Sequence, residues 1–457
     1  MPLRDVRWDA QRTRLADWWG GVWRWVLLAC GLGLSVYLLL EQGIANSELT
    51  ASVLALLVVG AAITGSEPMA IPLIAMPALF VVQRVGLGDT DLSASDVALA
   101  AAFGTAVLLA HRPYSAPLRQ LLWLNLVYQA TTLFTVIVNP YTANTIEWVH
   151  AWLLISGALI VGWALGRAGK AQAAFVLMLT AACVMAVGTV ITAVFQFAQG
   201  DFGEVYPAWP LPMHKNAAGT LMAFVALIAH VHPDWAGLRL VWLRPIFWLL
   251  VISIVLTQSR QAIIGLVVAI IVLSMRRGAT RRARAAAWLV IPAVWLVVVT
   301  VIEQIESQNR FNSFFQRVDW LREVYALWKQ SPLFGHGLRY WYTDTSAAFQ
   351  PPQAEVEIAA SAGVVGLLGF LLMWVGVLVV LWRVDPRFGS LAFAVVLCRI
   401  VQSQFDLFWV AGQASVPFVI AGICIGAMAR ESENLLPSRV SQRPRARSSG
   451  LYPRPLA

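Results

Sequence analysis

Two groups of polar residues interrupt long apolar stretches, and both contain cations suited to an anionic substrate. His214, Lys215 and Asn216 stand where a polar segment meets an apolar run. Ser259 and Arg260 belong to five consecutive polar residues between two apolar runs. An arginine held in a tight turn at a membrane surface suits a phosphate, because its planar guanidinium offers several donors and stays charged. The alternatives are that Lys215 only reaches interfacial water and that Arg260 only faces water at a hairpin.

A third polar group lies within a single apolar run near the carboxyl end of the chain. Arg399, Gln402 and Asp406 are spaced i, i+3 and i+7, which places them on one face of a predicted helix. In a membrane protein such a face turns inward, either toward a polar cavity or to form a structural ion pair. Both interpretations predict that these side chains avoid lipid.

The longest polar segment, 304–355, contains residues that could act as an acid or a base. His336 lies between two glycines, which permit close backbone approach, and Arg339, a further candidate cavity residue, follows it. Glu355 and Glu357 come directly before the next apolar run. A carboxylate there serves either as a base or as a favourable charge at a helix N-terminus. The candidate catalytic residues are therefore His336, Glu355 and Glu357.

The composition of the 457 residues decides the class of protein in which these groups operate. Hydrophobic residues make up 59% and charged residues 12%, against roughly half and roughly a quarter in soluble domains. This excludes a secreted disulfide scaffold, a disordered protein and a typical cytosolic enzyme. The formal net charge is +9, and the arginines gather in short segments between apolar runs. That distribution is typical of the cytoplasmic loops of membrane proteins and not of a nucleic-acid-binding surface.

Motifs of several enzyme classes are absent from the sequence. It contains no P-loop, dinucleotide fingerprint, HExxH or GxSxG motif, and no acidic cluster with metal-ligand spacing. The four cysteines lie within apolar runs and are expected to be buried core residues: Cys30, Cys183, Cys398 and Cys424. We therefore expect neither a metal nor a cofactor.

The apolar runs predict an all-α polytopic membrane protein with about 12–14 transmembrane helices. Some shorter runs also fit half-helices or re-entrant segments. The candidate spans are 21–40, 50–65, 68–84, 95–111, 117–137, 144–166, 171–198, 216–231, 238–257, 260–275, 285–303, 356–382, 388–406 and 410–428.

The basic segments predict the orientation of the chain, with both termini in the cytoplasm and the segments 199–215 and 304–355 on the outer face. Within the second segment, apolar residues at helical spacing over 318–328 predict an amphipathic helix that ends before Pro332. The expected organisation is a cytoplasmic N-terminus (1–20), a helix bundle (21–303), a large outer loop (304–355), C-terminal membrane helices (356–428) and a disordered basic tail (429–457).

The order of these features resembles the O-antigen ligase and O-antigen polymerase family of bacterial envelope glycosyltransferases. Ser259 and Arg260 head a span, and a basic segment, one further span and an amphipathic helix lead into the stretch 331–337. Glu357 then precedes a span that begins with the motif Gly-Val-Val-Gly at 363–366. The best match covers about 210–375.

The resemblance implies an enzyme of the bacterial inner membrane whose large periplasmic loop covers a cavity for a glycan linked to undecaprenyl diphosphate. It implies that Arg260 binds the diphosphate and that Asn216 matches a family asparagine, with His214 and Lys215 as further diphosphate-binding candidates. A base would activate an acceptor hydroxyl. Direct displacement of the lipid diphosphate then predicts inversion at the anomeric carbon without a metal.

The resemblance leaves the base and the acceptor open. Many members carry His-Asn shortly before the Gly-x-x-Gly motif, where this chain has Pro352 and Gln353. The base is therefore sought among His336, Glu355 and Glu357. The acceptor is most simply the lipid A core, as for an O-antigen ligase. The alternatives are a second lipid-linked glycan, as for an O-antigen or exopolysaccharide polymerase, and a pilin-like protein.

Two other classes of protein stay open beside the transferase. A polysaccharide or lipid transporter would also have many spans and buried charges, but it would produce no new covalent product. A scaffold of an envelope assembly complex would tolerate the loss of both Arg260 and His336.

Overall fold

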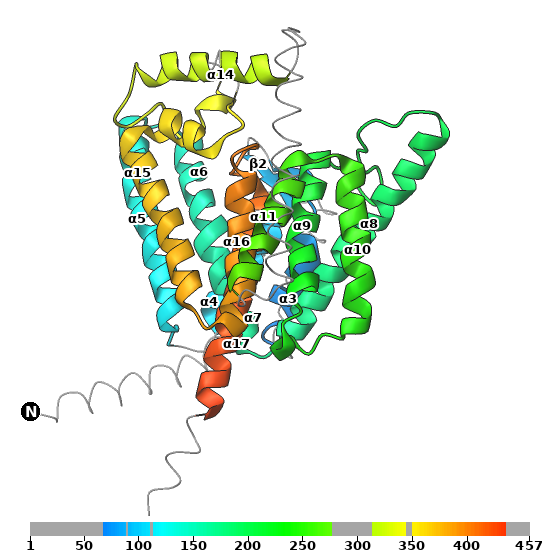
Figure 1. Ribbon diagram of the computed structural model, residues 1–457. Coiled ribbons are helices and arrows are strands. Elements are labelled where there is room, and N and C mark those ends of the chain that lie inside the picture. Colours follow the sequence, from blue (N-terminus) through cyan, green and yellow to red (C-terminus); the bar gives the residue numbers. More distant parts are fainter. Residues whose placement is uncertain (1–66, 88–89, 110–112, 277–312, 344–349, 436–457) are drawn as a thin grey trace, which may run out of the picture.

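The computed structural model describes residues 67–87, 90–109, 113–276, 313–343 and 350–435. The predicted spans 21–40, 50–65 and 285–303 lie outside these ranges, as do the N-terminal segment 1–20 and most of the tail. The described chain forms a bundle of helices with one further helix laid across it (Figure 1). The helices are α3 Ala70–Ala78, α4 Ala94–Leu109, α5 Ala116–Val138, α6 Thr142–Trp152, α7 Ala158–Arg167, α8 Ala171–Ala198, α9 Lys215–Val231, α10 Leu240–Thr257, α11 Arg260–Arg276, α14 Ser313–Trp328, α15 Ala354–Arg383, α16 Pro386–Gln402 and α17 Ala411–Leu435.

The architecture is that of an all-α polytopic membrane protein. Among the described residues, six helices are long and apolar enough to cross a bilayer, and α6 and α7 form one of them through the π-helical segment Leu153–Gly157. Predicted span 171–198 coincides with α8, and 260–275 coincides with α11 within one residue. Apolar runs bounded by polar or glycine residues therefore locate most of these helices well.

The largest departure from the predicted spans is at 68–84, where α3 covers only Ala70–Ala78. Pro77 lies within the last turn of α3, and a short antiparallel hairpin follows, with β1 Arg84–Leu87 paired to β2 Thr90–Ser93. Proline removes a backbone donor and disfavours further helix, so the helix stops early. A smaller departure is α17, which continues to Leu435, beyond the predicted end at 428.

The extension of α17 has a physical reason in its ion pairs. Glu431 accepts a hydrogen bond from Arg387, and Glu433 pairs with Arg167 at the end of α7. These contacts tie the last turns of α17 to the bundle, so the helix runs past the end of its apolar sequence.

The centre of the bundle is the crossing of α7 and α17. Gly162 and Gly166 of α7 face Gly422 and Gly426 of α17, and a Cβ at any of the four would overlap backbone of the partner helix. Small residues let membrane helices approach closely, and the approach is stabilised by packing. The crossing contributes to the burial of α17, in which residues 411–426 are all buried.

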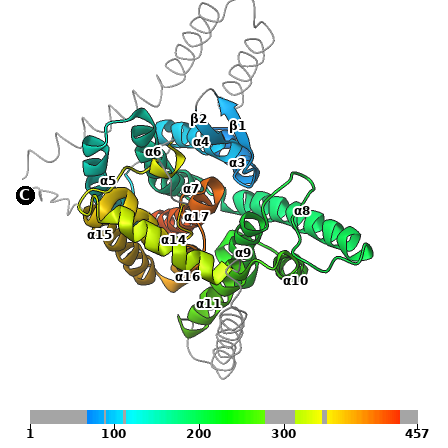
Figure 2. The ribbon, with the colours of Figure 1, turned by 90° about the horizontal axis from the view of Figure 1, so that it is seen from above.

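The two ends of the bundle differ. Helix α14 lies across one end, roughly perpendicular to the bundle helices (Figure 1), and runs from above α15 toward α9 and α11 (Figure 2). We call this the α14 end. Helices α7, α11 and α15 finish at the opposite end with Arg167, Arg276 and Arg383. The predicted amphipathic helix is thus present as α14, and the described arginines Arg167, Arg276 and Arg383 lie at the far end from it.

Candidate active site

The hairpin between α10 and α11 presents Arg260 at the α14 end. Helix α10 ends with Gln258 in the left-handed conformation, at φ 51°, so the chain reverses within two residues. Ser259 is buried, whereas Arg260, the first residue of α11, is exposed. Gly219 of α9 packs directly on Ser259, where a Cβ would lie 2.8 Å from the serine Cβ. The hairpin is therefore fixed against the start of α9.

The start of α9 brings the other predicted diphosphate ligands to the same place. His214 is the N-cap, and its Nδ1 accepts a hydrogen bond from the backbone N–H of Asn216 at 3.3 Å. The Ser259 hydroxyl donates to Asn216 Oδ1 at 3.4 Å. We name His214, Lys215, Asn216 and Arg260 the cationic cluster. Because the cluster also includes a helix N-terminus, its backbone dipoles favour an anion there.

An acidic residue from the preceding loop balances the cationic cluster. The Lys215 ammonium pairs with the Glu204 carboxylate, and the Tyr206 hydroxyl donates to the same carboxylate at 3.2 Å. The hydrogen bond from Lys215 lowers the pKa of Glu204 below its ordinary value, and the charge of Arg260 lowers it further. Glu204 therefore neutralises the charge of Lys215 when no other anion is bound. Sequence reasoning missed Glu204, although an acidic residue within the loop 199–215 was a visible signal.

A line of polar residues leads from Arg260 into the interior. Gln261 donates to Asp406 Oδ2 at 2.6 Å, and Gln404 donates to Glu355 Oε1 at 2.7 Å. Glu355 is half-buried, and its second oxygen, Oε2, has no hydrogen-bond partner within the described part of the chain. The segment 403–410 thus links the cationic cluster to a carboxylate at the start of α15.

The expectation that Arg399, Gln402 and Asp406 share one continuous helix is wrong. Helix α16 ends at Gln402, and Asp406 lies on the irregular segment that follows. Arg399 is fully buried and donates from Nη2 to the carbonyl oxygens of Leu407, at 2.8 Å, and Phe408. The Phe408 carbonyl also accepts a hydrogen bond from the Val410 N–H, and the charge-assisted bonds from Arg399 stabilise the irregular segment that follows α16. Arg399 therefore holds the shape of 403–410.

Gln402 also has a packing role. It is buried and donates to the sulfur of Cys398 at 3.3 Å, one turn earlier on α16. Gly265 of α11 leaves room for this side chain, since a Cβ at 265 would lie 2.8 Å from Gln402 Cγ.

Glu357 lies in a different environment from Glu355. It is 3% exposed and accepts a hydrogen bond from Gln350 at 3.0 Å. Together with Tyr128, Glu147 and Trp409 it lines a small cavity between α5, α6 and α15. Glu357 is therefore enclosed within the bundle, whereas Glu355 belongs to the polar line toward Arg260.

His336 lies in the segment 331–337, which exchanges backbone hydrogen bonds with α15. We call this segment the interlocked loop. Helix α15 is broken at Gly363, which has φ 66°, and the backbone N–H groups of His336 and Gly337 donate to the carbonyls of Ala360 and Ser361. In return, the N–H groups of 364 and 365 donate to the carbonyls of 332 and 333. The loop thus satisfies the backbone groups that the break exposes. The His336 ring also bonds, through Nε2, to the Leu327 carbonyl at 2.9 Å.

Arg339 pairs with a buried acidic residue. Its Nη1 lies 3.1 Å from Glu147 Oε2, and its guanidinium lies 4.0 Å from the centre of the Tyr342 ring. Glu147 also contacts His150, at 3.4 Å, whose other ring nitrogen lies 3.0 Å from Asp96. Sequence reasoning missed this series of side-chain contacts, which runs from Arg339 through Glu147 and His150 to Asp96. Its signal was present, because acidic and histidine side chains within the predicted spans 95–111 and 144–166 need partners.

The comparisons with known proteins agree with this geometry. A family model described as O-antigen ligase matches residues 245–371, which include α11, α14 and the interlocked loop. No curated protein matches the chain. Residues 245–371 therefore match an O-antigen ligase domain, which supports the resemblance predicted from the order of the sequence motifs.

Proposed function

We propose that this chain is an O-antigen ligase of the bacterial inner membrane. It would transfer a glycan from undecaprenyl diphosphate to a hydroxyl of the lipid A core on the periplasmic face. The observation that carries the proposal is the cationic cluster at the α14 end, joined by a polar line to Glu355 and lying partly within the stretch that matches the family. The arginines at the opposite end support a cytoplasmic location for that end and a periplasmic one for α14.

The cationic cluster is suited to stabilise the departing diphosphate. As the bond between the anomeric carbon and the diphosphate oxygen breaks, its electron pair stays on that oxygen and negative charge builds up. Arg260 and Lys215 are the first residues of α11 and α9, and their charges would interact more strongly with the transition state than with the less negatively charged ground state. Lys215 would exchange Glu204 for the diphosphate on binding.

Glu355 is the base that the structure favours among the three candidates. His336 lies in the contact between 331–337 and α15, and no described hydrogen bond joins it to the polar line, whereas Glu357 is enclosed among α5, α6 and α15. Glu355 and Glu357 each have one unpartnered oxygen among the described residues, but of the two only Glu355 lies on the polar line toward Arg260. It would accept the proton of the acceptor hydroxyl as that oxygen attacks the anomeric carbon, which inverts its configuration.

The test is transfer by the purified full-length protein in lipid nanodiscs. The substrates are undecaprenyl-diphosphate-linked glycan and lipid A core, and the products are elongated lipopolysaccharide and free undecaprenyl diphosphate. Glu355→Gln should lower the rate about 10²–10⁴-fold, the usual contribution of a positioned base. Arg244→Ala, an exposed arginine of α10 at the opposite end, is the matched control and should transfer normally.

The glycans of cells that lack this protein distinguish the three possible acceptors, which are lipid A core, a second lipid-linked glycan and a pilin-like protein. Loss of all long glycan from lipid A core supports the ligase, whereas a single repeat attached to core assigns a polymerase. An unchanged lipopolysaccharide pattern with an underglycosylated pilin assigns protein glycosylation. Uptake or flipping of the lipid-linked glycan without any new covalent product would overturn the transferase.

A further inference from the structure

An apolar groove between α8 and α10 lies apart from the cationic cluster. It has a volume of about 530 Å³. Its walls are Val176, Cys183 and Val184 of α8 and Trp242 and Ile246 of α10. None of the residues that line it belongs to the cationic cluster or to the polar line that leads to Glu355. The groove therefore calls for a ligand of its own.

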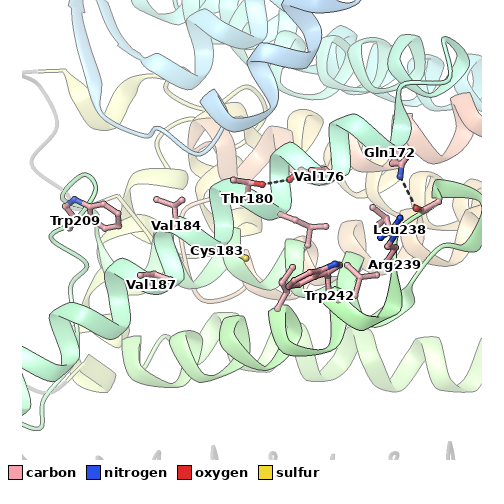
Figure 3. A pocket seen from close by; sticks show the side chains of 14 residues that line it. Gln172, Val176, Thr180, Cys183, Val184, Val187, Trp209, Leu238, Arg239 and Trp242 are labelled. Atoms are coloured by element: carbon pink, nitrogen blue, oxygen red, sulfur yellow. Dashed lines mark hydrogen bonds between the residues drawn. The ribbon is translucent and has the colours of Figure 1, made fainter.

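The two ends of the groove are chemically different. Trp209 closes one end, and Arg239 and Gln172 stand at the other (Figure 3). Gly188 of α8 allows the Trp209 backbone to lie against the helix, since a Cβ at 188 would overlap the tryptophan carbonyl. The Gln172 amide donates to the Gly237 carbonyl at 3.0 Å and so fixes the start of α10 beside the start of α8. The groove is thus closed by an aromatic side chain at one end and has a cation at the other.

The walls of the groove are open to the hydrocarbon of the bilayer. Trp242 is 65% exposed and Val187 is 41% exposed, although both lie on helices apolar enough to span the membrane. Surface of this kind on a membrane-spanning helix faces lipid chains rather than water. A groove in that surface is filled by hydrocarbon, which identifies the occupant as a lipid chain.

The charge of Arg239 at one end of the groove indicates which head group that lipid carries. Arg239 is the exposed N-cap of α10 and lies at the end of the bundle opposite α14, where Arg167, Lys170 and Arg244 also lie. A cation beside an apolar groove at a basic membrane face suits an anionic phospholipid of that leaflet. The diphosphate of the glycan donor is proposed to bind at the other end, beside Arg260. The donor therefore does not account for an apolar groove with a cation at this end.

We propose that the groove between α8 and α10 binds an anionic phospholipid. Its phosphate lies at Arg239, and one acyl chain extends along Val176, Cys183 and Val184 toward Trp209. The site is independent of the transfer reaction, and it would hold the same lipid whether the chain is a ligase or a polymerase.

Photocrosslinking of the full-length protein in nanodiscs tests the proposal. Phosphatidylglycerol or phosphatidylcholine, each with a diazirine in one acyl chain, is incorporated, and labelled peptides are identified by mass spectrometry. We expect labelling within 176–187 that is about fivefold stronger for phosphatidylglycerol, which corresponds to about 1 kcal/mol for one interfacial arginine. Arg239→Gln should abolish the preference, and Arg244→Gln, on the same helix but outside the groove, should keep it.

A groove-filling variant tests the position of the chain. Val184→Trp should remove labelling within 176–187 by both lipids while the protein keeps its helical content and elutes as wild type. Equal labelling by the two phospholipids, or an equal effect of Arg239→Gln and Arg244→Gln, would overturn the anionic specificity. Displacement of the label by undecaprenyl diphosphate, but not by phosphatidylglycerol, would assign the groove to the donor instead.

Discussion

The two arginines at the ends of α11 show how one residue type serves opposite purposes. Arg276, the last residue, donates from Nη2 to the carbonyl oxygens of Trp382 and Val384 at 2.7 Å each, and its guanidinium stacks 5.0 Å from the Trp382 ring. Arg260, the first residue, is exposed, and no hydrogen bond joins its side chain to another described residue. Nη2 of Arg276 thus completes the end of α15. The side chain of Arg260 makes no described hydrogen bond, as its proposed role in diphosphate binding requires.

Removal of Arg260 should give the largest effect on chemistry. Arg260→Ala should lower the rate of glycan transfer about 10²–10³-fold, the loss typical when one fixed donor to a developing anion is removed. The unfolding midpoint should stay at the wild-type value, because no described hydrogen bond is broken. Arg260→Lys should recover part of the rate, since it restores the charge but not the planar fork. Initial rates at equal protein abundance measure both. Wild-type transfer by Arg260→Ala would remove this residue from the mechanism.

Removal of Arg276 should affect stability rather than chemistry. Arg276→Ala should lower the free energy of unfolding by about 1–3 kcal/mol, because it leaves carbonyls at the end of α15 without their charged donor. The rate per folded molecule should be unchanged. Thermal unfolding followed by fluorescence in nanodiscs measures the first quantity, and transfer below the unfolding midpoint measures the second. If Arg276→Ala lost transfer as severely as Arg260→Ala, the contrast between the two ends of α11 would fail.

The smallest expected effect is that of replacing Glu204, whose carboxylate pairs with Lys215 of the cationic cluster. The pKa of Glu204 is lowered, so its pairing with Lys215 stabilises the fold above the ordinary carboxyl pKa of 4.5 and is lost as the pH falls through the lowered value. Glu204→Gln should therefore destabilise the protein slightly at neutral pH, by under about 1 kcal/mol for so exposed a pair. The difference from wild type should disappear in acid. A difference that persisted unchanged below pH 3 would contradict this assignment.

Most of the fold could be predicted from the sequence, because membrane helices carry their own signal. The ends of α8 and α11 follow from where the apolar runs meet polar residues. The end of α16 could not be predicted, since Phe405, Leu407 and Phe408 continue the apolar run beyond Gln402. The turn is stabilised by tertiary contacts, among them the bonds from Arg399 to the carbonyls of 407 and 408 and the bond from the Ala354 N–H to the carbonyl of 403.

The candidate site was predictable in its residue types but not in its groupings. The cations near 214 and 260 stood out because charge beside apolar runs is costly. That Ser259 touches Asn216 depends on the packing of α9 against the α10–α11 hairpin, which no local pattern encodes. The separation of Glu355 from Glu357 likewise depends on tertiary contacts, because Glu355 meets Gln404 after the end of α16, whereas Glu357 meets Gln350 ahead of α15.

The interlocked backbone of the loop and α15 limits how the family's loops can be exchanged by engineering. The bonds between 332–337 and 360–365 run in both directions, and Gly335 and Gly363 each pack where a Cβ would overlap the opposing strand of backbone. A chimaera that takes only one of these two segments from another member would leave buried amides and carbonyls mismatched. Loop exchanges intended to alter acceptor choice should therefore carry both segments together, as one cassette.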